Sequence, residues 1–267
     1  MNPSRIVTVT ALSLSLAACG EAGGAGSDQG IGAILGTAAP LGYAGALSLA
    51  ALDGNGPACV TVVTACATPP CDGEVTIDVA TCALPVAASA TGLVSVSLSR
   101  SSTDMATMIA QFVDVDAGGQ GLTVAQATVT VTRSGTSVST TYTDQDVQSA
   151  DGSSTVQQSS WSIDVETQGT WDDGGDDVIT ITGAGQTVVG SDVSQVSITN
   201  AVMDPSCRLN PISGSATVQD VAGINVQQMS LDFHSTCDGL ADIDVAVSLD
   251  PFGNNGSGGT VALDMLN

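Results

Sequence analysis

Glu74-Val-Thr-Ile-Asp-Val79 and Val94-Ser-Val-Ser-Leu98 decide the fold class, because polar and apolar side chains alternate residue by residue in both stretches. A period of two places the apolar residues on one face of a strand and the polar residues on the other. A sheet with one apolar and one wet face is typically antiparallel, whereas a parallel sheet is buried on both faces. The same alternation returns in Trp161–Val165, Val196–Asn200, Met229–Phe233 and Ile243–Val247. We therefore predict an all-β protein with a mainly antiparallel sheet.

Turn-forming residues separate these runs. Pro69-Pro70, Ser134-Gly135, Gly174-Gly175 and Gly183-Ala-Gly185 are typical of connections between strands. Their spacing predicts roughly 12–14 strands in a β-domain that covers residues 58–267. A two-sheet sandwich and one long curled meander both accommodate such a series, and the sequence does not choose between them.

A long uncharged segment, Ile31–Leu52, precedes the β-domain and is nearly long enough to span a bilayer as a helix. It consists mostly of Ala and Gly and is interrupted by Pro40, so a second membrane contact is the less favoured interpretation. Within residues 31–57 we predict a short helix from about Leu41 to Leu52, which ends at Asp53-Gly54 and caps one end of the sheet.

One internal repeat is visible. Cys71–Ala80 and Cys237–Ala246 are identical at seven of ten positions. Each copy reads as a Cys, a tight Asp-Gly turn and an alternating strand. Duplication of a β-unit and convergence on good hairpin chemistry both explain the likeness.

Six cysteines follow Cys19, and an even number in an exported chain indicates disulfides. A hairpin of residues 59–65 against 73–81 would bring Cys66 and Cys71 together across its turn. Cys59 and Cys82 would then meet near its open end, which leaves Cys207 and Cys237 for each other. Zinc is the competing interpretation, but Cys66 and Cys71 have a loose zinc spacing, and no second close pair of cysteines exists.

Charge excludes some partners. The chain has 27 acidic residues against four basic ones, with a formal net charge of −23, and three of the four basic residues follow Cys19 (Arg100, Arg133 and Arg208). Nucleic-acid binding is excluded, since Lys and Arg supply the contacts with phosphate. The same balance argues against contact with a lipid surface, apart from an anchor. So acidic a chain repels itself and tolerates counter-ions.

The N-terminus carries an export signal. Arg5 precedes an uncharged run from Ile6 to Ala18, which is too short to span a bilayer, and the run ends in Leu16-Ala-Ala-Cys19-Gly20. This ending resembles the lipobox of bacterial lipoproteins. The resemblance implies a signal peptide at residues 1–18 and lipid attached to Cys19. The Gly-rich composition that follows predicts a flexible tether at residues 19–30. Because Gly20 rather than Asp follows the cysteine, the resemblance favours the outer membrane.

Candidate reactive groups are few. His234 is the only histidine, no Gly-x-Ser-x-Gly motif occurs, and no Asp-Thr-Gly or Asp-Ser-Gly is present. We therefore predict no catalytic residues and no enzyme activity. The densest acidic cluster offers oxygen ligands to Ca²⁺ around a Gly-Gly turn, although a solvated hairpin tip is the favoured interpretation; its carboxylates belong to Asp172, Asp173, Asp176 and Asp177.

The functional expectation follows from the anchor and the sheet. We expect an outer-membrane-anchored, non-enzymatic envelope lipoprotein with a structural or adhesive role, which needs no cofactor other than this Ca²⁺. Its protein or ligand partner cannot be read from the residues. The first alternative is a carrier that holds a lipophilic molecule in a β-concavity, and the second is a secreted hydrolase with paired Asp carboxylates.

Overall fold

The computed structural model describes residues 27–82, 91–117, 120–123, 127–149, 154–167, 177–189, 192–204, 211–220, 227–235, 240–247 and 258–262. These residues form one helix, α1 (Ser27–Leu52), and 14 strands. The strands are β1 (Val60–Thr64), β2 (Cys71–Asp78), β3 (Thr91–Ser102), β4 (Met105–Ala117), β5 (Gln120–Thr123), β6 (Ala127–Ser134), β7 (Ser137–Ser149), β8 (Ser154–Glu166), β9 (Val178–Val189), β10 (Asp192–Met203), β11 (Pro211–Asp220), β12 (Gln227–Phe233), β13 (Leu240–Val247) and β14 (Gly258–Ala262).

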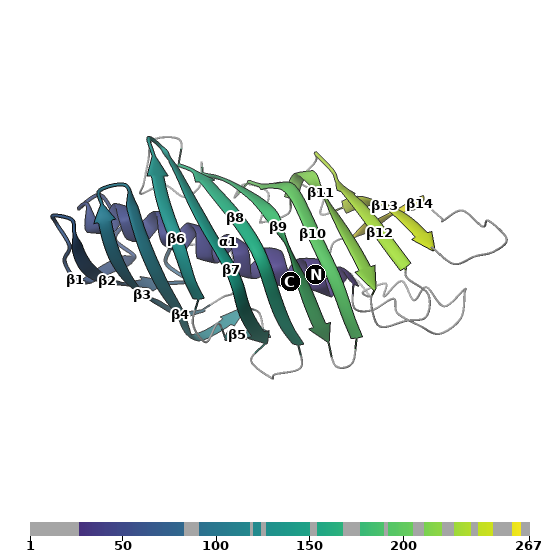
Figure 1. Ribbon diagram of the computed structural model, residues 1–267, viewed down its shortest axis with the longest axis horizontal. Coiled ribbons are helices and arrows are strands. Elements are labelled where there is room, and N and C mark those ends of the chain that lie inside the picture. Colours follow the sequence, from purple (N-terminus) through teal and green to yellow (C-terminus); the bar gives the residue numbers. More distant parts are fainter. Residues whose placement is uncertain are drawn as a thin grey trace, which may run out of the picture.

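All of these strands belong to one open antiparallel sheet (Figure 1). Each strand pairs with the next along the chain, except that the short β5 lies beside β4 and β7 while β6 joins the same two strands elsewhere along their length. The prediction of an all-β, antiparallel fold is confirmed. Of the two architectures that the sequence left open, the structure has the curled meander and not the sandwich.

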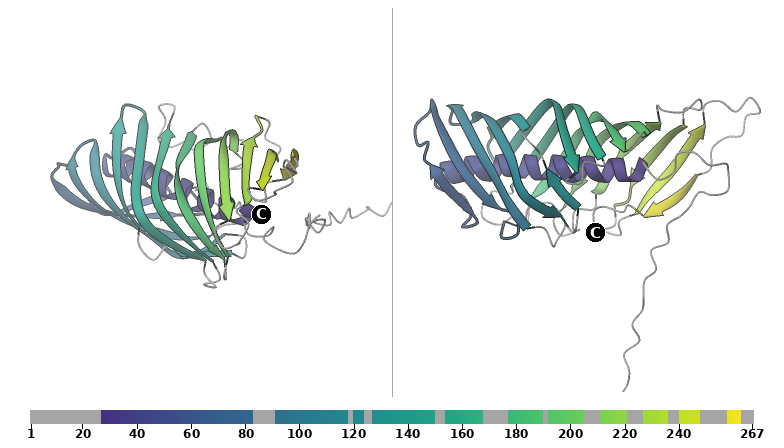
Figure 2. Two further views of the ribbon diagram at one scale, coloured as in Figure 1. Left: turned by 45° about the vertical axis from the view of Figure 1, so that its right-hand side comes forward. Right: turned by 90° about the horizontal axis from the view of Figure 1, so that it is seen from below.

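Helix α1 lies inside the curl of the sheet (Figure 2). We call the concave side of the sheet the trough; it is lined by inward-facing residues of the strands, among them Val75, Val96, Met108, Val131, Val138, Ile163, Ile181 and Ile198. Every residue of the helix from Ala38 to Leu52 is buried, as expected for a helix that is apolar on all sides. The predicted position at one end of the sheet is therefore wrong. So is the predicted start near Leu41, because the helix begins at Ser27 within the predicted tether and continues through Pro40.

Glycines let the helix approach the strands closely. A Cβ atom on Gly42 would lie 2.2 Å from Cγ2 of Ile163 on β8, and one on Gly45 would lie 2.9 Å from Oγ1 of Thr140 on β7. At the other end of the helix, Leu52 packs over Gly73 of β2, where an added Cβ would meet its methyl groups at 2.9 Å. The helix thus crosses the strands from β8 towards β2, with no space for a side chain at these glycines.

Two segments that were predicted to be turns lie within strands. Asp72-Gly73, expected to be a tight turn in the internal repeat, is extended within β2, and Gly183-Ala-Gly185 lies inside β9. Both glycines serve packing. Gly73 makes room for Leu52, and Gly183 faces the Trp161 ring, which a Cβ would meet at 2.5 Å. In contrast, Ser134-Gly135 does form a turn, with Gly135 at a φ of 64°.

The N-terminal hairpin agrees with its prediction. β1 pairs with β2, and disulfides join Cys59 to Cys82 and Cys66 to Cys71. Cys207 and Cys237 lie outside the described residues, so the third bond stays a prediction. Within the described part of the chain, no helix is both long and apolar enough to cross a membrane.

Candidate functional site

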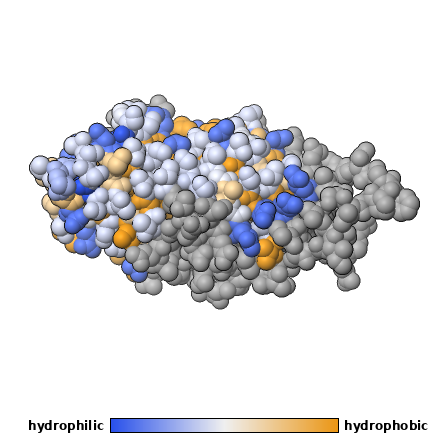
Figure 3. All heavy atoms as spheres, in the orientation of Figure 1, coloured by the Kyte–Doolittle hydropathy of each residue, from blue (hydrophilic) through white to orange (hydrophobic). Residues whose placement is uncertain are grey.

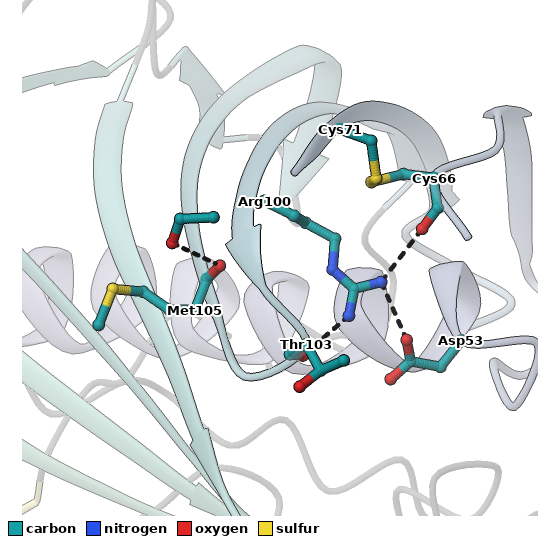
Figure 4. Close-up of a disulfide and its surroundings, with 7 residues drawn as sticks. Asp53, Cys66, Cys71, Arg100, Thr103 and Met105 are labelled. Carbon is teal, nitrogen blue, oxygen red and sulfur yellow. Dashed lines mark hydrogen bonds and ion pairs between the residues drawn. A yellow bond between two sulfur atoms is a disulfide. The ribbon is translucent and has the colours of Figure 1, made fainter. Parts of the chain in front are cut away.

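A polar cluster around one buried side chain lies where α1 ends. Arg100 follows Val94, Val96 and Leu98 at the inward-facing positions of β3, and its side chain is only 1% exposed. Its guanidinium donates from Nη1 to Oδ1 of Asp53 at 2.9 Å and to the carbonyl of Cys66 at 3.3 Å (Figure 4). Nη2 donates to the carbonyl of Thr103 at 2.8 Å. A single buried cation therefore joins the helix end, the disulfide loop and the β3–β4 turn.

A second arginine completes the cluster. Arg133 of β6 donates from Nη1 to the other carboxylate oxygen of Asp53 and from Nε to Asp104 at 3.3 Å. Its Nη2 reaches the Thr103 carbonyl at 3.0 Å. Burial disfavours the charged form of Arg133, but the carboxylates of Asp53 and Asp104 outweigh it and raise the pKa of the guanidinium above its usual value. We call Asp53, Arg100, Thr103, Asp104 and Arg133 the clasp.

The clasp has a structural role rather than a catalytic one. Asp53 is a carboxylate just beyond the C-terminus of α1, where the helix dipole favours positive charge. Arg100 and Arg133 provide that charge and neutralise Asp53. Breaking one partner of such a buried pair is costly, because the other charge stays buried. The clasp therefore fixes the end of the helix against β3 and β6.

A different feature dominates the convex side of the sheet. One hydroxyl per strand lines up across six strands that pair in turn, and we call this line the hydroxyl row: Ser99, Thr107, Thr130, Thr141, Ser162 and Thr182. The outward residues around it on β3, β4, β6 and β7 carry no charge where their side chains are described. Figure 3 shows this area as pale, with scattered apolar residues. In this acidic chain, the middle of the convex face is thus neutral and hydroxylated.

Acids border this neutral area on both sides. Asp72 and Glu74 lie on the outer face of β2, and Asp164 and Glu166 lie on that of β8. The wet face that the sequence predicted is present, and its described charges on β2 and β8 flank the neutral strands.

Only one of the four predicted calcium ligands lies among the residues that the structure describes. Asp172, Asp173 and Asp176 lie outside the described residues, so calcium binding stays a prediction. Asp177 is described and only 3% exposed, directly before β9, which does not fit a solvated hairpin tip at that residue. Among the described residues, no group of three or more metal-binding side chains is present.

The remaining predicted positions add no reactive centre. His234 follows the last residue of β12 and is half-buried. The lipidation residue Cys19 lies outside the described residues, and its role remains a prediction. The two disulfides indicate a protein that resides outside the reducing cytoplasm.

Sequence reasoning missed the clasp. Arg100 occupies a position that the alternation of β3 assigns to the core, and it is one of only four basic residues in the chain. Arginine is almost never fully buried unless it is paired, so an arginine at a core position is itself a signal for a buried ion pair. That Arg133 also reaches Asp53 could be seen only once the order of the strands in the sheet was known.

Comparisons of the chain with protein-family models, with curated proteins and with solved structures found no match. Function therefore has to be argued from the residues themselves.

Proposed function

We propose that the protein is a non-enzymatic envelope lipoprotein with a structural or binding role, anchored in the outer membrane through Cys19. One observation carries the non-enzymatic part: the concave side of the sheet is occupied by the chain's own helix. Residues 38–52 of α1 are buried on every side against the trough. A concave pocket is where a substrate or a lipophilic ligand would ordinarily bind. With the trough filled, the convex face and the edges of the sheet are the surfaces offered to partners.

The anchor is supported by the lipobox-like ending at Cys19 and by the disulfides of the hairpin. Two or more acyl chains suffice for stable anchoring, because each buried methylene contributes about 0.8 kcal/mol. The test is metabolic labelling with a fatty acid, followed by cell fractionation. Wild type should carry label and sediment with the outer membrane, whereas Cys19→Ala should carry none. Label that persists in the variant would refute the anchor.

A carrier remains the second candidate, because the trough is apolar along its length and holds an apolar helix. A carrier would have to move α1 aside before it could bind a lipophilic molecule. Titration with a fluorescent fatty acid analogue separates the two functions. A packed trough predicts no saturable binding, whereas one-to-one saturable binding would favour the carrier.

A further inference from the structure

The strand β1 forms one edge of the open sheet. Among the described strands it pairs with β2 alone. Its five residues Val-Thr-Val-Val-Thr contain no charge and no proline, although charge and proline are common protection for an edge. Val62 and Val63 are 40% and 57% exposed, the latter at a bulge in the pairing with β2. We call residues 60–64, with the side that no described strand pairs, the β1 edge.

Covalent bonds hold this strand where burial does not. Four of its five residues are exposed, so packing against the core contributes little. Cys59 directly before the strand is bonded to Cys82, and Cys66 two residues after it is bonded to Cys71. Both described disulfides therefore bracket one poorly buried edge strand. A strand fixed in this way loses little freedom when another strand pairs with it.

The backbone of the β1 edge is oriented for pairing. Asp78 N–H donates to the Cys59 carbonyl, which marks residues 59 and 78 as facing each other across the ladder. Because the groups of an antiparallel strand point alternately to its two sides, the N–H and C=O of Val62 point away from β2. An added strand would find its first partners there.

Charge decides the kind of partner. Glu74 and Asp78 lie on the outer face of β2 opposite the two ends of β1, and Asp72 lies two residues beyond Glu74 on the same face. Thr81 donates its backbone N–H to Asp78 and lowers the pKa of that carboxyl, so the group is charged at neutral pH. The two described arginines are both held by Asp53 in the clasp. Three negative charges therefore lie on the outer face, separated from a docked strand by β1 alone, without a described cation beside them.

A second copy of the chain fits this edge less well. Edge-to-edge pairing would bring together two chains of net charge −23, which repel each other. A cationic partner is attracted instead.

The geometry points to the β1 edge as a docking site for an extended basic peptide segment, which adds as a strand beside β1. Its backbone pairs with Val62, and alternate Lys or Arg side chains reach back over β1 to the carboxylates of β2. This inference deepens the binding role proposed above and is independent of the anchor. If Cys19 carries no fatty-acid label but the β1 edge still binds the peptide, only the anchor is refuted.

The test uses the full mature chain, purified from whichever cell fraction contains it. The probe is a fluorescent peptide of alternating Lys and Val, and a Glu-Val peptide serves as its control. We expect the Lys-Val peptide to bind and the Glu-Val peptide not to. Affinity should fall as NaCl increases, because the screening length drops from about 10 Å at 0.1 M to about 3 Å at 1 M. Equal binding of both peptides, or none of either, would overturn the proposal.

Variants locate the site. Val62→Pro removes the outward donor without touching the ladder to β2 and should weaken binding about tenfold. Val62→Thr keeps the donor and should bind like wild type. The pair Asp72→Asn and Glu74→Gln should weaken binding and flatten its salt dependence. Unchanged affinity in Val62→Pro would contradict the proposal.

Hydrogen exchange of the wild-type chain gives a readout that needs no variant. The bound peptide should slow exchange of the Val62 amide, and protection confined to other strands would overturn the assignment. If the protein self-associates, and if Val62→Pro abolishes this association while NaCl strengthens it, the β1 edge binds a second copy of the chain. That result would also overturn the proposal.

Discussion

At the scale of single residues, Arg100 is the group whose loss the fold should tolerate least. Replacing it by Met leaves Asp53 with one arginine and leaves the carbonyls of Cys66 and Thr103 without this donor. We expect Arg100→Met to lower the free energy of unfolding by about 3 kcal/mol, as for other broken buried pairs. Denaturant unfolding measures this loss.

Asp104 provides the matched control, because it belongs to the same clasp but is 60% exposed. Asp104→Asn should cost less than about 1 kcal/mol, as exposed ion pairs do. Equal losses in the two variants would show that burial of Arg100 does not determine the strength of the clasp.

Gly42 tests how closely the helix lies on the sheet. Alanine is the better helix former by about 1 kcal/mol, so Gly42→Ala would stabilise a helix with free space around it. Here its Cβ would overlap Ile163, and overpacking costs about 1–3 kcal/mol. We expect net destabilisation in thermal unfolding. In an Ile163→Ala background the same change should cost less, and strict additivity of the two changes would argue against direct contact.

At the scale of elements, the strands and the end of the helix at Leu52 could be predicted, whereas the start of the helix and its place in the trough could not. Strand residues such as Val94 and Leu98 alternate with serines, and this local pattern survives whatever the sheet packs against. The extent of α1 depends on the trough. Pro40 and several glycines argue against a long helix in water. Inside the curled sheet, Gly42 and Gly45 instead allow close packing, which offsets their low helix propensity.

The same reasoning applies to the misread glycines. Gly73 and Gly183 are turn signals in a sequence, because glycine is the commonest turn residue. In the structure each leaves room for one large side chain, Leu52 or Trp161. The sequence around a glycine does not show which bulky residue of another element packs against it. The clasp was missed for the same reason, since Asp53 and Arg133 are 80 residues apart.

The N-terminal hairpin provides a prediction at this scale. Cys59–Cys82 closes a longer loop than Cys66–Cys71, with sequence separations of 23 and 5. Loop-closure entropy then predicts a loss of about 3 kcal/mol for the pair Cys59→Ala and Cys82→Ala, and about 2 kcal/mol for Cys66→Ala and Cys71→Ala. Denaturant unfolding of the two double variants ranks them, and the reverse order would show that strain or packing outweighs chain entropy.

At the scale of the whole molecule, excess negative charge opposes compaction. With a net charge of −23, the folded chain repels itself more than the expanded chain does. Added salt screens that repulsion, so NaCl between 0.1 and 1 M should raise the melting temperature. The Arg100→Met variant should respond at least as strongly, because it carries one more net negative charge. A melting temperature that stays constant or falls would mean that attractive pairs outweigh the repulsion.

Helix α1 should be a permanent part of the core rather than a removable occupant of the trough. Native-state hydrogen exchange of the mature protein tests this directly. If the trough is permanently filled, amides of residues 38–52 should exchange as slowly as those of the central strands β3 and β8, through global unfolding alone. Exchange of the helix much faster than these strands would contradict the account and indicate a lid over a ligand-binding trough.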